Sequence, residues 1–136
     1  MIRPIIKDPF FLGQKSEDAV KEDLPIGQDL QDTLYAHRDR CVGMAANMIG
    51  VRKKIIIVSM GMAAIVMYNP RLLKKDMPYE AEEGCLSLTG TRKTVRYRSI
   101  EVEYLHGSWK KYRQIFTGQI AQIIQHEVDH LYGVVI

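Results

Sequence analysis

The feature that most constrains this chain is a histidine pair near its C-terminal end, His126 and His130, with Glu127 directly after the first. Residues four apart stand about 40° apart around a helix of roughly 3.6 residues per turn, so both imidazoles can turn their nitrogens toward one cation. Glu127 lies too far round the helix to complete a tight ligand set, but its carboxylate can reach a water on that ion and take its proton. The pattern therefore predicts a metal-binding helix, and two polar positions on a solvated helix are the alternative.

A third ligand for such a site must come from upstream. Most proteases with a His-Glu-x-x-His helix take it from downstream, as Glu or His, but the side chains of residues 131–136 bind no metal. Thiolates bind zinc and ferrous iron strongly, so the two cysteines rank above His37, His106 and the acidic residues. Cys85 is preferred to Cys41, because a glycine precedes it and allows the chain to turn sharply.

Composition bounds the class of protein. A chain of 136 residues with 46% hydrophobic and 26% charged residues is typical of a single globular domain over residues 1–136. Its net charge of +3 is spread among acids, which favours solvated surface charge over nucleic-acid binding. The apolar run 55–68 is shorter than the roughly 20 residues of a membrane span, and residues 1–11 lack the features of a signal peptide. We therefore expect reduced thiols, no membrane and a cytoplasmic location.

Hydrophobic periodicity predicts an α+β fold. Residues 23–38 have apolar positions at helical spacing, and residues 1–22 are expected to be irregular. Further along, alternation places Val95 and Tyr97 on one face of a strand and Arg96 on the other. The remaining expectations are strands at 54–58 and 64–68, the second closed by Asn69 and Pro70, a charged loop at 74–82, two strands within 94–105 that meet at Ser99, a strand at 109–116, and a metal-binding helix opened by Thr117 and Gly118.

Three motifs, taken in order, resemble those of the peptide deformylases. They are residues 43–46 (GMAA), 83–87 (EGCLS) and 125–133 (QHEVDHLYG). The similarity continues more weakly through the predicted helix that precedes them and through the strands, so it covers nearly all of the chain. Three motifs are far more specific than one, and the ligand argument points independently to an upstream cysteine.

The resemblance implies a small α+β fold, with antiparallel β-sheets packed around a C-terminal metal-binding helix and a further helix near the N-terminus. It implies one divalent ion held by Cys85, His126 and His130, with ferrous iron expected and zinc, nickel or cobalt able to replace it. The family comprises hydrolases of protein biosynthesis that remove formyl from the N-terminal formylmethionine of newly made peptides. Asp129 is expected from its position to orient a ligand or nearby backbone.

The resemblance also implies roles in catalysis and substrate binding. Glu127 deprotonates the metal-bound water and returns the proton to the leaving amine. The backbone N–H of Leu86 and a glutamine of the first motif help the metal to hold the oxyanion. The substrate peptide lies as an extended strand beside Val42 and Gly43, and Ile123 borders its methionine pocket.

The chain departs from the family pattern in the first motif and in the pocket. Cys41 stands in place of the first glycine, and Met48 in place of the glutamine. A thioether cannot donate a hydrogen bond, and losing one oxyanion donor lowers turnover roughly 10²- to 10³-fold in other hydrolases. The amide of Asn47 is expected to point to the opposite side of an extended segment. Gln122 places a polar group near the pocket, beside Ile123.

Three functions therefore stay open. The first, which we prefer, is a metal-dependent deformylase with reduced activity; the second is a related enzyme that hydrolyses another small amide. The third is a metal-bound protein that binds peptide termini without catalysis. Glu127 favours an enzyme, because a structural metal site has no use for a general base, whereas Met48 favours the other two readings.

Overall fold

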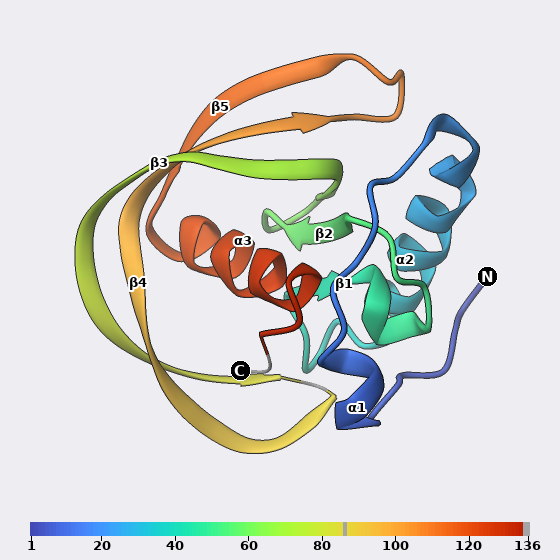
Figure 1. Ribbon diagram of the computed structural model, residues 1–136, viewed down its shortest axis with the longest axis horizontal. Helices are drawn as coiled ribbons and strands as arrows, with labels where there is room; N and C mark the ends of the chain where they lie inside the picture. The colour runs from blue at the N-terminus through green and yellow to red at the C-terminus, as the bar shows by residue number, and fades with distance from the viewer. Residues whose placement is uncertain (86, 135–136) are drawn as a thin grey trace.

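The computed structural model describes residues 1–85 and 87–134 of the chain. It confirms the predicted α+β class, with one longer helix in the N-terminal third and another at the C-terminal end (Figure 1). Its elements are, in order, α1 (Pro9–Leu12), the 3-10 helix η1 (Lys21–Asp23), α2 (Leu24–Ala36), β1 (Gly43–Ala45), the 3-10 helix η2 (Ala46–Ile49), β2 (Ile55–Ser59), β3 (Ala64–Cys85), β4 (Leu88–Leu105), β5 (Lys111–Thr117) and α3 (Gly118–Leu131).

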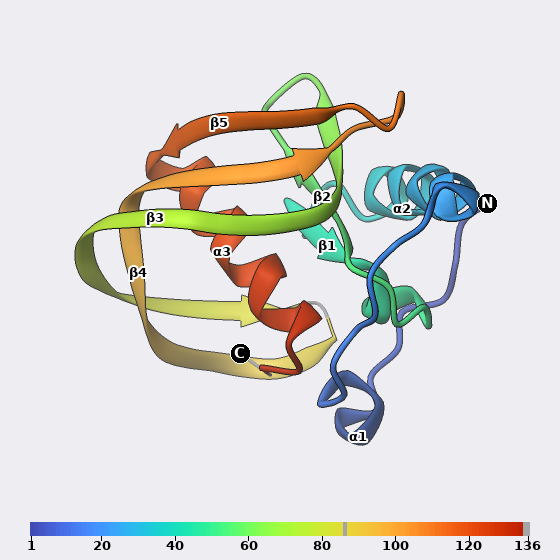
Figure 2. The same ribbon diagram turned by 45° about the horizontal axis from the view of Figure 1, so that its top comes forward.

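The strands of the described residues form a five-stranded sheet in the order β1-β2-β3-β4-β5, and every neighbouring pair is antiparallel. β3 and β4 are long and make a curved ribbon that bends round α3, as both views show (Figures 1 and 2). Register shifts in this pair, between Tyr68 and Arg71 and between Leu72 and Lys74, are of the kind that bend a strand. The curvature brings the end of β3 back to the helix.

The predicted strand end at Asn69 and Pro70 is wrong, and so is the predicted charged loop at 74–82. β3 runs through both segments. Asn69 has a φ of 52° and exchanges two hydrogen bonds with the backbone of Ala19, so the strand is irregular at this point without ending. Most side chains of 74–82 are exposed. The charges fit an exposed segment, but an exposed strand satisfies the same pattern as a loop.

Two further expectations need correction. Residues 94–105 belong to one strand, in which Ser99 pairs with Asp76 of β3 and Thr117 of β5, so the change of apolar phase falls inside a continuous strand. Residues 1–22 are not wholly irregular, because α1 forms with the side chain of Asp8 accepting a hydrogen bond from a backbone N–H of its first turn. No helix in the described part of the chain is long and apolar enough to cross a membrane.

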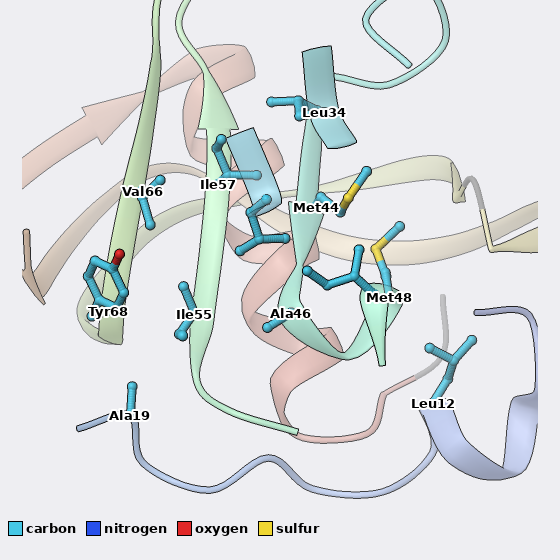
Figure 3. Packing of buried hydrophobic residues seen from close by; sticks show 12 residues of the cluster. Leu12, Ala19, Leu34, Met44, Ala46, Met48, Ile55, Ile57, Val66 and Tyr68 are labelled. Carbon is cyan, nitrogen blue, oxygen red and sulfur yellow. The ribbon is translucent and has the colours of Figure 1, made fainter. Parts of the chain in front are cut away.

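The buried apolar residues form two groups, one on each face of β2. Successive side chains of a strand point to opposite faces, so Ile55 and Ile57 join the group that packs under α2 (Figure 3), while Ile56 and Val58 join the group that packs on α3. A strand buried on both faces reads as a continuous apolar run, which explains the sequence of β2. The strand thereby fixes α2 and α3 relative to each other.

Gly27 of α2 generates a stability prediction, because the helix lies close to β3 at this point. A Cβ at residue 27 would clash with Oη of Tyr68 and approach Cγ1 of Val66 to 3.0 Å. The Tyr68 hydroxyl is also held in place, since it donates to the carbonyl of Leu24 at 2.9 Å. We expect Gly27→Ala to lower the free energy of unfolding by about 1 to 3 kcal/mol, despite the gain of roughly 0.5 to 1 kcal/mol in helix propensity. Urea denaturation measures the change.

The control is the same substitution in a Tyr68→Phe background, where the obstructing oxygen is gone. There the cost of Gly27→Ala should be smaller. An unchanged or higher free energy of unfolding for Gly27→Ala in the natural background would contradict the close packing of α2 on β3.

Candidate metal centre

α3 presents two histidines at one point. His126 and His130 lie one turn apart, are 8% and 0% exposed, and have ring centroids 4.9 Å apart. Their Nε2 atoms face each other at 3.2 Å. Two buried ring nitrogens this close need a shared proton or a cation between them, which is the geometry that their spacing on the helix predicts.

Cys85 joins the histidines because the curved ribbon returns the end of β3 to α3. Its Sγ and one nitrogen from each histidine all lie within 4.8 Å of one another. The other candidates for a third ligand have other partners. Cys41 lies in the wall of the adjoining cavity and donates to the carbonyl of Gly43 at 2.8 Å, while His37 and His106 each contact a backbone carbonyl away from the centre.

A carboxylate on the ribbon holds the outer nitrogen of the first histidine. Oε1 of Glu83 lies 2.8 Å from Nδ1 of His126, and Arg96 of β4 donates to both oxygens of Glu83, at 2.7 to 3.1 Å. Arg96 also donates to Asp129 at 2.6 Å, and Gln122 donates to Glu83 at 2.9 Å. Burial alone would raise the pKa of Glu83, but its hydrogen bonds to His126, Arg96 and Gln122 lower it to about 2.

Sequence reasoning missed Glu83 as the partner of His126, and Arg96 as the partner of Glu83. Asp129 was expected to orient a ligand or backbone, and its contact in the structure is with Arg96. The alternation in β4 is also inverted relative to an apolar interior, because Arg96 is 4% exposed whereas Val95 is 56% exposed. The alternation in the sequence does place Arg96 on the opposite face from Val95. It does not show which of the two faces is buried, so the buried position of Arg96 could not be predicted.

The two histidines differ in how they hold a proton. Burial alone would lower the pKa of His126, but hydrogen bonds to Cys85 and Glu83, with the charge of Glu127, raise it to about 10. Burial, and then the positive charge of His126, lower the pKa of His130 to about 4. A metal ion that binds both rings must therefore displace the proton of His126, so metal binding releases a proton.

Glu127 lies beside the histidines as a buried acid. Its side chain is 4% exposed. Burial, only partly offset by the charge of His126, raises its pKa to about 7. The missing side chain of Gly43 makes room for it, since a Cβ there would lie 3.0 Å from Oε2 of Glu127 and 2.6 Å from Ile123. A carboxyl group that titrates near neutral pH can both take and return a proton.

The donor set fits a divalent metal ion. One thiolate and two imidazoles leave one position of a tetrahedral zinc or iron site open for water. Among the described residues, buried Oε1 of Glu127 and Nδ1 of His130 lack a hydrogen-bond partner, and each such atom costs about 1 to 3 kcal/mol when left unpaired. An ion with its water would supply a hydrogen-bond donor within reach of the Glu127 oxygen.

A cavity of about 250 Å³ opens beside these residues, between α3, β1 and the end of β3. Val42, Gly43 and Ile123, which were predicted to bind substrate, all line it, and so does Met48. Leu86, the predicted backbone donor to the oxyanion, lies outside the described residues. The cavity thus joins the first motif to the candidate ligands.

The expectation for Asn47 is correct in direction but wrong in its reason. The segment is the 3-10 helix η2 and is not extended. Asn47 is fully buried, and its Nδ2 donates to the backbone carbonyl of His130 at 2.9 Å, which braces the last turn of α3. Its amide therefore serves the helix, and the sulfur of Met48 accepts a hydrogen bond from the N–H of Ala45 at 3.5 Å.

Comparison with known proteins agrees with this geometry. The family model described as polypeptide deformylase matches residues 2–136. The peptide deformylase of Clostridium beijerinckii is 56% identical over 136 residues, and the alignment covers 100% of both chains. The peptide deformylase of Halothermothrix orenii is 34% identical over 120 residues, and that alignment covers 86% of this chain and 77% of the relative.

Solved structures of similar fold point the same way. A class I type b peptide deformylase from Acinetobacter baumannii, bound to Met-Ala-Ser, has a TM-score of 0.90 at 28% identity and covers 99% of this chain and 97% of its own. The peptide deformylase of Thermotoga maritima has a TM-score of 0.89 at 28% identity, with coverage of 99% and 95%. The family model and the relatives match nearly the whole chain, and the fold and the Cys-His-His group are consistent with that match. This protein therefore belongs to the polypeptide deformylase family.

Proposed function

We infer that this protein is a peptide deformylase, a metallo-hydrolase that removes the formyl group from the N-terminus of formylmethionyl peptides. The observation that carries the inference is the meeting of Cys85, His126 and His130 beside the buried carboxyl group of Glu127. A structural relative from Acinetobacter baumannii is bound to Met-Ala-Ser, which is the peptide that deformylation of formyl-Met-Ala-Ser would leave.

Cys85, His126 and His130 are the residues that would hold one divalent ion. When bound, the ion supplies Lewis acidity toward water and toward the formyl oxygen. Ferrous iron is the ion we propose, and zinc, nickel or cobalt can satisfy the same donors. Glu83 fixes the ring of His126 through Nδ1, so that its Nε2 stays aimed at the ligand point, and Arg96 keeps Glu83 ionised in its buried position.

Glu127 carries the proton in the proposed reaction. Its carboxylate accepts a proton from the attacking water, and the carboxyl group then delivers that proton to the amine nitrogen as the C–N bond of the formamide breaks. The products are formate and a free N-terminus. A pKa of about 7, raised by burial, suits both transfers, and Gly43 allows β1 to pack directly against Glu127 and Ile123.

The free edge of β1 is the proposed binding site for the peptide backbone. The N–H of Ser59 donates to the carbonyl of Val42, so in an antiparallel pair the N–H and carbonyl of the next residue, Gly43, point away from β2. β1 is an edge strand of the sheet. An extended peptide can therefore pair with Gly43 and place its first side chain in the cavity. The thiol of Cys41 donates to the same Gly43 carbonyl and would have to yield to the peptide.

Hydrolysis of another small amide is the second candidate function. Met48 favours it, because this side chain lines the cavity and cannot donate a hydrogen bond to a developing oxyanion.

Substitution of the two cysteines tests the ligand set. Cys85→Ala should lose most of the metal because one of three strong ligands is removed, whereas Cys41→Ala should keep about one ion per chain. Elemental analysis of protein purified without oxygen measures both contents and identifies the metal. Equal metal loss in the two variants would contradict the assignment of Cys85.

Substitution of Glu127 tests the proton carrier. Glu127→Gln keeps the shape of the side chain but cannot accept a proton, so we expect full metal content and a loss of turnover of about 10²- to 10⁴-fold. Single-turnover hydrolysis of formyl-Met-Ala-Ser by the iron- or nickel-loaded protein measures the effect. Turnover within tenfold of the natural protein would exclude Glu127 from this role.

Substitution of Met48 separates the two candidate functions. A glutamine can accept the Ala45 N–H through Oε1, as the sulfur does, and offer its Nε2 to the oxyanion. We expect Met48→Gln to raise turnover of formyl-Met-Ala-Ser at least tenfold, because the loss of one such donor costs roughly 10²- to 10³-fold in other hydrolases. Met48→Leu is the matched control and should give no rise. Absence of hydrolysis in the natural protein and in Met48→Gln, with metal bound, would favour the second candidate function.

A further inference from the structure

The cavity beside the candidate ligands contains a polar side chain that the proposed chemistry does not use. Gln122 lies one turn before His126 in α3, so both side chains leave the same face of the helix. Gln122 lines the 250 Å³ cavity and also a neighbouring hollow of about 450 Å³ that includes Tyr79 and Arg98. The side chain therefore forms part of the boundary between the two spaces.

Gln122 is held at both ends of its amide. The hydroxyl of Tyr79 donates to Oε1 at 3.1 Å, and Nε2 donates to Oε2 of Glu83 at 2.9 Å. A carboxylate can only accept hydrogen bonds, so the amide nitrogen must be the atom that faces Glu83. Arg96 in turn holds Glu83. These two contacts hold the amide in one orientation.

One hydrogen-bond donor of this amide is left over. The Nε2 group carries two N–H bonds, and among the described residues only Glu83 accepts one of them. The cavity wall has apolar parts, formed by Val42, Met48 and Ile123, and further polar side chains, which are Arg40, Glu82 and Gln119 besides the groups already described. A peptide that pairs with β1 would place its first side chain against this wall. That side chain would meet the fixed amide of Gln122 beside these apolar residues.

We propose that Gln122 makes the pocket select methionine through its sulfur atom. The spare N–H donates to the thioether, which is a weak acceptor. Norleucine has the same length but a methylene in place of sulfur, so it leaves the donor unpaired. A sulfoxide oxygen is a better acceptor than a thioether, so formylated peptides that begin with methionine sulfoxide are a second substrate class of this pocket. The proposal rests on the proposed deformylase function, because it concerns the same cavity.

The test compares kcat/KM of the metal-loaded protein for three substrates, which are formyl-Met-Ala-Ser, formyl-norleucyl-Ala-Ser and formyl-Met-Ala-Ser oxidised to the sulfoxide. We expect the natural protein to prefer methionine over norleucine about 3- to 10-fold, the worth of one neutral hydrogen bond. It should hydrolyse the sulfoxide within tenfold of methionine. In Gln122→Leu the ratio of kcat/KM for methionine to that for norleucine should fall to about one. The kcat/KM for the sulfoxide peptide should then be more than tenfold lower than that for the methionine peptide.

Ratios between substrates separate selectivity from damage to the metal centre. Gln122→Leu also removes a hydrogen bond to Glu83, and any resulting loss of metal or of catalysis lowers all three rates alike. Gln122→Met keeps the length of the side chain without a donor and gives the same test if Gln122→Leu does not fold. Gln31→Leu, an exposed position on α2 outside the 250 Å³ cavity, is the matched control and should keep the natural ratios.

The outcomes distinguish this proposal from the function beneath it. Hydrolysis of formyl peptides with ratios that Gln122→Leu and Gln122→Met leave unchanged would overturn the role of Gln122 and leave the deformylase function intact. Failure of the metal-loaded natural protein to hydrolyse any of the three peptides would overturn both.

Discussion

The hydrogen bond between Glu83 and His126 is the contact on which the rest of the centre depends, because it joins the curved ribbon to the helix. Arg96 completes it from β4 by holding both oxygens of Glu83. Breaking one partner out of such a buried charged group leaves an uncompensated charge, which costs about 3 to 5 kcal/mol. Charged contacts as well as apolar packing therefore hold the ribbon in position against α3. Cys85 lies two residues beyond Glu83, so the same contact also positions Cys85.

Close approach of backbones is the second requirement of the centre. Gly43 lets β1 lie against α3 with no side chain between them, and this proximity helps to bury Glu127. Burial is in turn what raises the pKa of Glu127 to about 7. A small residue in one strand therefore tunes an acid in a helix far along the chain. The same closeness leaves the free edge of β1 as a wall of the cavity.

The sequence predicted those features that depend on interactions between residues close together in the chain. The helical periods of α2 and α3, the continuous apolar run of β2 and the four-residue spacing of His126 and His130 each follow from short-range geometry, and all agree with the structure. The three motifs added Cys85, which the ligand argument alone could only prefer. The site could therefore be assembled in outline from residues close in sequence and one motif between them.

What could not be predicted depends on the curvature of the ribbon. Whether residues 74–82 are a loop or an exposed strand is decided by pairing with β4 and not by composition. Arg96 points inward while Val95 points outward, because the ribbon folds its charged side over the polar face of α3. Asn47 turns toward His130 because η2 replaces an extended segment. Each of these is a contact between residues far apart in sequence.

The shortness of β1 has a consequence for which polypeptides can dock. Unpaired strand edges invite other chains to add to a sheet, yet β1 offers only three residues, all buried, and the thiol of Cys41 occupies the carbonyl of Gly43. A segment in the middle of a folded protein continues in both directions and would need room beyond both ends of this short edge. A loose chain terminus has nothing ahead of its first residue. An edge of three residues therefore suits the free end of a chain better than a segment in its middle.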